Sequence, residues 1–394
     1  MNYFQSKRRF LAYFLLLTIL CASLPLTKTQ AASDFKIKKG VLISYSGKKA
    51  KLTIPKGVTA IGERAFADCT SLKSVTIPKA VKSIGDSAFS GCTNLSTITI
   101  PKTITSIGSF AFSGTKWLKN QQKKDSLVIV NQILITGSTA KGKVKIPSGV
   151  TSIADNAFSG CTAITSVTIP KGVLTIGASA FYDCTKLKSV TLPKGLKLID
   201  SNAFSGCKKL TGLTLPKGLK SIGNSAFYDC AKLTEITIPN GVLSIGNNAF
   251  NNCIALKEIT IPKSVTSIDS YAFANTKWIE AQKKKNPLVI VNQILIDGSA
   301  ASGEVTIPDG VISICAGAFH SNQNLTAITL PDGILSIGQE AFFGCSGLAN
   351  VSFPDSLASI GQETFLGCTS LKSVALPKGI ELGNHAFDSQ TELQ

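Results

Sequence analysis

The sequence predicts a solenoid of the α/β class. In it, 23-residue repeats stack on one another, short parallel strands dominate, and single helical or 3₁₀ turns and few longer helices complete the coils. The prolines carry this prediction, because they recur every 23 residues with two gaps of 46, twice that length. They stand at Pro55, Pro78, Pro101, Pro147, Pro170, Pro193, Pro216, Pro239, Pro262, Pro308, Pro331, Pro354 and Pro377. With each proline as slot 1, apolar residues hold slots 4, 7, 11, 12, 15, 18, 21 and 23. That pattern is too sparse for a helix and too regular for a globular domain.

Two segments of each frame have the pattern of short strands. Slots 21 and 23, such as Val75 and Ile77, alternate about an outward threonine, as in a strand with one buried face. The proline that follows ends this strand because it has no N–H to give to the ladder. Slots 4 to 7 permit a second short extended run before a glycine. Each frame is therefore expected to supply one main strand and one shorter extended piece.

The next segment of the frame has the signals of a single helical or 3₁₀ turn. Slot 9 is rich in helix N-cap residues such as Asp86 and Ser109, and glycines such as Gly91 end the segment. No single frame can bury its own apolar residues, so stacked frames must share a core. The core is expected to contain a spine of phenylalanines at slot 12, namely Phe66, Phe89, Phe158, Phe181, Phe204, Phe227 and Phe250.

The frame resembles a known repeat family. The pattern L-x-x-V-x-I-P-x-x-V-x-x-I-G-x-x-A-F-x-x-C, as in residues 72–92 and, with leucines at one Ile and one Val position and Asp200 at the Gly position, residues 187–207, is similar to the BspA-type leucine-rich repeat of secreted and cell-surface proteins. The resemblance covers nearly all of the chain beyond its first residues. It implies a leucine-rich-repeat solenoid with roles in adhesion, matrix-protein binding and coaggregation. It implies no catalytic residues and transfers no particular ligand.

The first 32 residues have the pattern of a signal peptide. Lys7, Arg8 and Arg9 precede an apolar stretch, and a small-residue cleavage region lies near Ala31 and Ala32. The apolar stretch is short for a membrane span, so a signal anchor is the weaker alternative. No later stretch has the length and apolar character of a span. We therefore expect a secreted or cell-surface protein with a signal peptide at 1–32 and a solenoid at 33–394.

The composition is basic. The formal net charge is +18, of which Lys7, Arg8, Arg9 and Lys28 contribute four charges before the cleavage region, leaving 18 − 4 = +14. Such a surface attracts polyanions, and the candidates are teichoic acids, sulfated glycans and acidic proteins. Nucleic acid is not expected as a partner because the lysines are dispersed and no basic helix appears. A solvated basic surface without a specific partner is the alternative.

No residue pattern indicates an enzyme, a metal site or a cofactor. The two histidines, His320 and His385, lie in different repeats and at different slots, so they form no ligand pair. No P-loop, dinucleotide fingerprint or G-x-S-x-G appears. The solvent slots hold scattered Asp and Glu residues, which are read as exposed surface residues.

Cysteines dominate slot 15. Ten remain after residue 32, and nine of them share that slot: Cys69, Cys92, Cys161, Cys184, Cys207, Cys230, Cys253, Cys345 and Cys368. Stacked neighbours would stand about 5 Å apart, within reach of a disulfide. The slot also accepts Thr115, Thr276 and Asn322, which a bonded partner would not allow. A ladder of small buried thiols is therefore favoured over disulfides.

Two surface rows are candidate binding sites. The outward slot 22 holds a row of threonines, of which the candidates are Thr76, Thr99, Thr168, Thr191, Thr214, Thr237 and Thr260. Slot 2 holds a row of lysines, of which the candidates are Lys171, Lys194 and Lys217, with Asp309, Asp332 and Asp355 in the same slot near the C-terminus. A threonine ladder can dock a protein or glycan, but β-branched residues also suit the solvent face of any strand. The lysines could steer an acidic partner, or protect a sheet margin from aggregation.

Two related segments interrupt the frame at residues 115–135 and 276–296. Each keeps the 23-residue grid and begins with a polar stretch that predicts a short helix, anchored by Trp117 or Trp278. Each ends in an apolar stretch that predicts two strand pieces around Asn131-Gln132 or its counterpart. The tryptophans could be glycan platforms, but packing against the adjoining coil is the favoured interpretation. These segments, and a related one near residue 35, are expected to open blocks at 33–115, 116–276 and 277–394.

The pattern as a whole favours an exported, non-enzymatic adhesion or interaction protein that binds a protein or glycan through an extended repeat surface. The alternative is a cell-envelope protein that holds anionic wall polymers through its lysine rows. A non-catalytic part of a glycan-acting system is a third, weaker reading.

Overall fold

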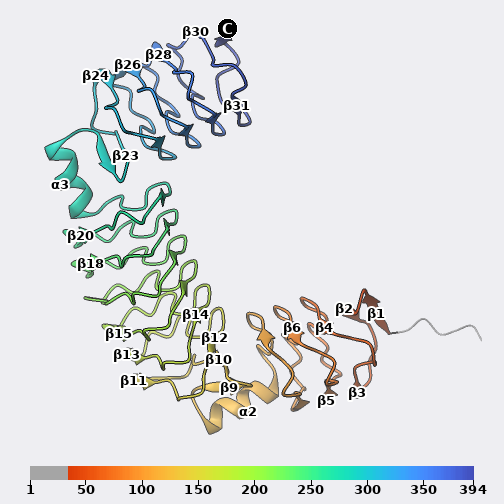
Figure 1. Cartoon of the computed structure of the whole chain (residues 1–394). Coiled ribbons are helices and arrows are strands. Elements are labelled where there is room, and N and C mark those ends of the chain that lie inside the picture. Colours follow the sequence, from red (N-terminus) through yellow and green to blue (C-terminus); the bar gives the residue numbers. More distant parts are fainter. Residues whose placement is uncertain (1–33) are drawn as a thin grey trace, which may run out of the picture.

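The computed structural model describes residues 34–394, so the expected signal peptide lies outside the described residues. The described chain is a solenoid of short coils with two helices (Figure 1). Coil after coil adds its strands to two rows on different sides of the solenoid. The predicted fold class, a solenoid of 23-residue coils with mainly short parallel strands, is confirmed.

The first row of strands is called here the threonine face. Its strands are β3 (Lys51–Thr53), β5 (Ser74–Thr76), β7 (Thr97–Thr99), β11 (Gly142–Lys145), β13 (Ile164–Thr168), β15 (Ser189–Thr191), β18 (Glu235–Thr237), β20 (Glu258–Thr260), β24 (Gly303–Thr306), β26 (Leu325–Thr329), β28 (Asn350–Ser352) and β30 (Ser373–Val374), with β32 (Glu392–Leu393) beside β30. The strands pair in parallel, coil to coil, in four sheets plus the β30–β32 pair. Val75 and Ile77 are buried while Thr76 is exposed, which confirms the alternation predicted for the main strand.

The second row is called the serine face, because most of its two-residue strands begin with serine. They are β4 (Ala60–Ile61), β6 (Ser83–Ile84), β8 (Ser106–Ile107), β12 (Ser152–Ile153), β14 (Thr175–Ile176), β16 (Leu198–Ile199), β17 (Ser221–Ile222), β19 (Ser244–Ile245), β21 (Ser267–Ile268), β25 (Ser313–Ile314), β27 (Ser336–Ile337), β29 (Ser359–Ile360) and β31 (Glu381–Leu382). In each, the isoleucine or leucine is aligned with its neighbours in register, as in Ile84 with Ile107. The second extended piece expected from slots 4 to 7 is thus a true strand.

The segment between the serine face and slot 15 differs from the prediction. It is a run of β-turns and not a helical or 3₁₀ turn. Ser87 and Gly91 adopt φ of 52° and 73°, a left-handed conformation that breaks any helix at both points. Alternate amides then point to the next coil, as when Phe89 N donates to Ala111 O at 2.8 Å. Asp86 does not cap its own turn; its carboxylate accepts from Ser109 N, 23 residues on, at 2.8 Å.

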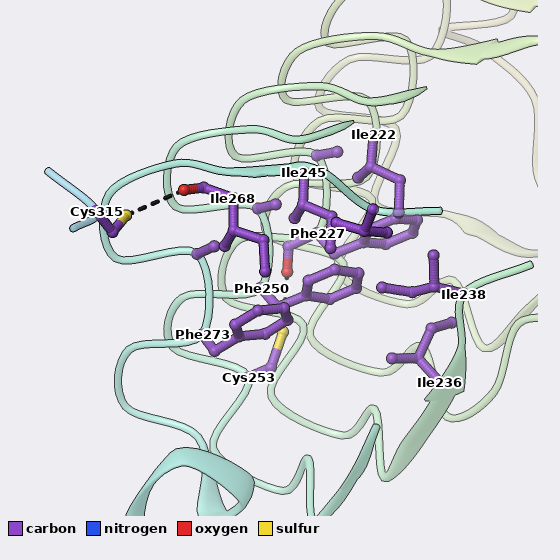
Figure 2. Close-up of a cluster of buried hydrophobic side chains, with 14 of the residues drawn as sticks. Ile222, Phe227, Ile236, Ile238, Ile245, Phe250, Cys253, Ile268, Phe273 and Cys315 are labelled. Atoms are coloured by element: carbon purple, nitrogen blue, oxygen red, sulfur yellow. Dashed lines mark hydrogen bonds between the residues drawn. The ribbon is translucent and has the colours of Figure 1, made fainter. Parts of the chain in front are cut away.

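The interior of the solenoid is a phenylalanine stack, as predicted. Rings of successive coils lie nearly parallel, with centroids 4.9 Å apart for Phe66 and Phe89 and 5.2 Å apart for Phe227 and Phe250. Figure 2 shows Phe227, Phe250 and Phe273 in file between the isoleucines of the two faces. A distance of about 5 Å between the centroids of nearly parallel rings is a favourable aromatic geometry. Repetition of one side chain therefore builds a continuous core.

Three β-hairpins interrupt the regular coils. They are β1 (Phe35–Lys38) with β2 (Val41–Tyr45), β9 (Val128–Val130) with β10 (Ile133–Thr136), and β22 (Val289–Val291) with β23 (Ile294–Asp297). In the second, Asn131 and Gln132 have φ of 47° and 70°, the left-handed pair of a tight hairpin turn. The strand pieces and the turn predicted for the two interruptions are confirmed.

The helices α2 (Lys116–Lys124) and α3 (Lys277–Lys285) precede the second and third hairpins. Thr115 caps α2, with its hydroxyl 3.1 Å from Leu118 N and 2.7 Å from Phe112 O. Thr276 caps α3 at the same distances from Ile279 N and Phe273 O. Figure 1 shows that the solenoid bends at both helices, with the helices and the threonine face on the outer side and the serine face on the inner side. The two helices therefore set the direction of the solenoid.

The slot-15 cysteines line the core beside the phenylalanines. All are buried except Cys69, which is half-buried, and their thiols are free. Where the preceding coil carries a phenylalanine, the buried thiol donates to the carbonyl of that phenylalanine, as Cys253 Sγ does to Phe227 O at 3.0 Å (Figure 2). Cys161 follows the interrupted coil and donates to Ala140 O at 3.3 Å instead. Burial is the first cause that raises the pKa of the Cys161 thiol, which favours the neutral donor form. The ladder of buried thiols predicted from slot 15 is present.

Candidate binding face

The threonine candidates lie on the threonine face, two on the sheet before α2 and five on the coils between α2 and α3. Parallel pairing aligns Thr76 with Thr99, Thr168 with Thr191, and Thr237 with Thr260. Every one of the seven candidate threonines is exposed. Because side chains alternate along a strand, the buried or partly buried apolar residues on either side of each threonine fix its hydroxyl outward. The face is thus a column of hydroxyl and methyl groups at the spacing of the coils.

The lysine candidates border this column. Lys171, Lys194 and Lys217 are all exposed, and each stands one residue after the slot-1 proline of its coil. Glutamates stand two residues before Thr237 and Thr260, at Glu235 and Glu258, and are exposed as well. The central coils therefore present a hydroxyl column between a basic margin and two carboxylates.

A groove interrupts the face in the middle of the chain. Its volume is about 980 Å³, and Thr191, Thr214, Thr237, Lys194, Lys217 and Glu235 are among its lining residues. The groove forms at Gly212, which occupies the slot that holds Ser189 in the preceding coil and Glu235 in the following coil. Only an isolated bridge joins Gly212 to Ser189, and no strand forms around Thr214. A Cβ added at Gly212 would meet no atom within 4 Å, so the missing side chain leaves open space.

The tryptophan candidates do not join this face. Trp117 is only 9% exposed and packs on Phe112 with ring centroids 4.8 Å apart, so its indole face is not available as a platform. Trp278 is half-buried and meets Phe273 edge-on at 5.0 Å. Both tryptophans end a phenylalanine stack where a helix begins. The favoured interpretation, packing against the adjoining coil, agrees with this geometry.

Charge is divided along the solenoid. Residues 34–285 carry 35 Lys and Arg against 13 Asp and Glu, a net charge of +22. Residues 286–394 carry 2 against 10, a net charge of −8. Asp309, Asp332 and Asp355 are exposed in the acidic part, at the slot that holds lysine elsewhere. The threonine face therefore passes from a basic to an acidic surface beyond α3.

The histidines are separate surface groups. His320 Nδ1 lies 2.9 Å from Ser321 Oγ, and its Nε2 lies 3.9 Å from Glu340 Oε2. His385 stands in another coil, at φ 52°. Between residues 34 and 394, no group of three or more His, Cys, Asp or Glu is placed to hold a metal ion. In the same part of the chain, no helix has the length and apolar character to cross a membrane.

The groove was not predicted from the sequence, although a signal for it was present. Gly212 is the only glycine at slot 20 of the regular frames between residues 55 and 376. The coil therefore has no side chain at the position where its neighbours carry Ser189 and Glu235. Thr214 occupies slot 22 like the other candidate threonines, so the slot pattern predicts a continuous row of threonines.

Comparison with known proteins identifies the repeat. A family model described as the BspA type leucine rich repeat region, with six copies, matches residues 43–165, 151–280 and 298–394. No curated protein matches the chain.

Solved structures also resemble the chain. A leucine-rich repeat protein from Bacteroides ovatus is 23% identical, with 91% of this chain and 88% of that chain covered and a TM-score of 0.33. A leucine rich cell surface protein from Faecalibacterium prausnitzii is 28% identical, with coverage of 90% and 83% and a TM-score of 0.31. A T. pallidum leucine rich repeat protein is 30% identical, with coverage of 49% and 82% and a TM-score of 0.28.

Proposed function

Since the chain belongs to the family of the BspA-type leucine-rich repeat, we propose that it is an exported, non-enzymatic adhesion or interaction protein that binds a protein or glycan through its threonine face. The observation that carries the proposal is the groove at Gly212, where exposed threonines meet lysines and glutamates in one hollow. Hydroxyls and charged groups of both signs can bond a polar polymer at many points. The flat, repeated face multiplies such contacts along an extended ligand.

The energetics favour many weak contacts over one strong contact. Each exposed hydrogen bond contributes about 0.5 to 1.5 kcal/mol after water is displaced. A ligand that spans several coils gains several such terms while it loses its translational freedom only once. A partner that follows the column of threonines is therefore expected to bind better as its length increases.

A screen of residues 33–394 against matrix proteins and a glycan array tests the proposal. The triple variant Thr191→Val, Thr214→Val, Thr237→Val removes three hydroxyls of the groove and keeps the β-branched shape. The matched control, Thr53→Val, Thr306→Val, Thr329→Val, removes three hydroxyls from the same face outside the groove. We expect at least tenfold weaker binding for the groove variant alone. Equal binding by all three proteins would contradict the assignment.

A second variant tests the groove by filling it. Gly212→Glu supplies the side chain that Glu235 and Glu258 carry at the equivalent slot, where a Cβ meets no atom. It is expected to weaken ligand binding without destabilising the coil. Ser74→Glu makes the same replacement on β5 and serves as the control.

The second candidate function is binding of anionic wall polymers, and the net charge of +22 over residues 34–285 favours it. Such binding would depend strongly on salt, because it is driven by exposed lysines. If binding to isolated cell walls survives about 0.5 M salt, where the Debye length is only about 4 Å, the threonine face is the better explanation. Loss of binding in Lys171→Gln, Lys194→Gln, Lys217→Gln, together with steep salt dependence, would favour the wall polymer.

A further inference from the structure

A cavity opens beside α3, away from the threonine-face groove. Its volume is about 470 Å³, and its lining includes Asp269, Tyr271, Glu280, Lys283, Asp297 and His320. This volume lies within the range of small-molecule sites, about 300 to 1,000 Å³. Helix α3 forms one wall, strand β23 a second, and the turn segments of the flanking coils the rest. The space arises because the phenylalanine stack is interrupted there, with Ile296 at the slot of the missing ring.

The equivalent position beside α2 provides an internal comparison. The two interruptions are 161 residues apart, and the α2 cavity has a volume of about 250 Å³. Five matched pairs differ in charge, namely Gly108 and Asp269, Lys119 and Glu280, Gln122 and Lys283, Thr136 and Asp297, and Asp155 and Ala316. The α3 cavity is thus lined by three carboxylates and one ammonium group, whereas the α2 cavity has one of each, Asp155 and Lys119. The α3 cavity is acidic in a chain that is basic as a whole.

The contacts within the cavity leave carboxylate oxygens for a ligand. Lys283 Nζ lies 2.7 Å from Glu280 Oε1 and 3.9 Å from Asp297 Oδ2, so Glu280 is its principal partner. Asp297 Oδ1 accepts from Ser299 N at 2.9 Å and from Ser299 Oγ at 2.7 Å. These bonds hold the Asp297 carboxylate in place. Asp269 is exposed on the same cavity wall.

An aromatic surface lies beside these carboxylates. The Tyr271 ring rests against the backbone of Gly317, where an added Cβ would come within 2.9 Å of the ring, so only glycine allows this position. Tyr271 is nevertheless 40% exposed. The His320 ring meets it edge-on at 6.4 Å, and its own position is fixed by stacking on Phe343 at 5.1 Å. Burial raises the pKa of the Tyr271 phenol, which therefore stays a neutral donor and acceptor.

From this arrangement we infer that the α3 cavity binds an amino sugar, a hexose unit with a free, protonated amine. The ammonium lies beside Asp269 and Asp297, where a charge-assisted hydrogen bond is favoured. One C–H face of the sugar packs on Tyr271, and its hydroxyls bond Asn251, Ser299 and His320, which line the same space. An acetylated sugar has no cation to offer, so the cavity discriminates by charge. The site is independent of the threonine face.

Titration of residues 33–394 with a β-linked glucosamine disaccharide tests this inference by calorimetry and by perturbation of amide resonances. The N-acetylated disaccharide is the paired ligand, and trilysine distinguishes an amino sugar from any amine. We expect the free-amine sugar to bind at least tenfold more tightly than the acetylated sugar or trilysine. Equal affinity for the acetylated sugar, equal or tighter binding of trilysine, or no binding of the free-amine sugar would overturn the inference.

Variants test whether the amino sugar binds in the α3 cavity. Asp269→Gly with Asp297→Thr installs the α2 residues and is expected to weaken binding at least tenfold. Asp332→Asn with Asp355→Asn removes the same charge from exposed positions outside the cavity and is expected to leave binding unchanged. Tyr271→Ala is expected to reduce affinity several-fold, since it removes the ring and keeps both carboxylates. If the two double variants lose affinity equally, general electrostatic attraction explains the binding and the cavity does not. The threonine-face variants should have no effect on this ligand.

Discussion

The α2 and α3 junctions use the same backbone device but join the coils differently. Each has a nine-residue helix capped by threonine and followed by a hairpin. At α2 the core divides: one cluster of buried residues extends from Leu42 to Ala154, and a second begins at Leu134. At α3 that second cluster continues without a break to Ala386. The same device therefore produces a division in the core at one place and continuity at the other.

Small differences account for this contrast. Ile279 of α3 is buried in the shared cluster, whereas its counterpart Leu118 is only partly buried. Cys315, which corresponds to Ala154, donates its thiol to Ile268 O at 3.0 Å and thereby joins the two serine-face sheets across the α3 junction (Figure 2). Continuity of a repeat core thus depends on a few side chains at each interruption. The α2 junction is expected to open first under stress.

The largest expected effect comes from the tryptophans. Trp117→Ala should destabilise the α2 junction by about 3 to 5 kcal/mol, because a buried indole is removed where the core is already divided. Trp278→Ala should cost about half as much, since Trp278 is half-buried and the core beside it is continuous. Urea unfolding with hydrogen exchange across β9 and β22 measures both losses. Equal losses would contradict the proposed difference between the junctions.

The helix caps should give matched effects. Thr115→Ala and Thr276→Ala each remove a buried hydroxyl that makes two hydrogen bonds of the same lengths. Each variant should lose about 1 to 2 kcal/mol of stability. Thermal unfolding of the two variants side by side provides the measurement, and Thr→Ser variants, which keep the hydroxyl, serve as controls. A large difference in stability loss between the two cap variants would mean that the α2 and α3 junctions differ in their helices and not in their cores.

The Cys315 thiol should contribute about 1 kcal/mol at the α3 junction, so Cys315→Ala should lose about that amount at neutral pH. Burial raises the pKa of this thiol to about 12. The protonated form is thus favoured in the folded state, and its contribution is complete below the unfolded pKa of about 8.5 and declines as pH rises toward 12. The difference in unfolding free energy between wild type and Cys315→Ala, followed from pH 7 upward, should shrink. A pH-independent difference would contradict this account.

The smallest expected effect is that of the ion pair on α3. Lys283→Gln installs the α2 residue and removes the contacts of Lys283 with Glu280 and Asp297. Because Glu280 is more than half exposed, the loss should be about 0.5 kcal/mol or less. Chemical denaturation at low and high salt measures it, and the difference from wild type should decrease as salt rises. The reciprocal variant Gln122→Lys has no carboxylate at 136 to meet and should gain nothing.

Most of the fold could be predicted from the sequence because the repeat encodes it locally. The alternating apolar slots predict the strands, and the single phenylalanine in each regular coil predicts the stack of rings. The polar stretch after Thr115 and Thr276 fixed the helices. The turn after the serine face was predicted wrongly, because residues such as Asp86 have the propensity of helix caps. Their actual partners, such as Ser109 N, belong to the next coil, which local propensity does not contain.

The candidate sites could be predicted only in part. The exposed threonine and lysine rows follow from slot position, and their role in binding stays a prediction. The division into blocks at residues 116 and 277 also stays a prediction. The groove depends on one glycine, Gly212, and on whether a strand forms around it. The acidic character of the α3 cavity becomes visible only when its lining is compared with the matching residues beside α2, 161 positions earlier. Each interrupted segment alone has the composition of an ordinary polar surface.

The separation of charge has a consequence for how the molecule meets a surface. With +22 on residues 34–285 and −8 on residues 286–394, the solenoid has a large electric dipole along its length. In the field of a negatively charged cell or mineral surface, a torque turns the basic end toward the surface and the acidic end away from it. A molecule that approaches such a surface would therefore be oriented before any specific contact forms. In that orientation the coils beyond α3 lie on the side away from the surface.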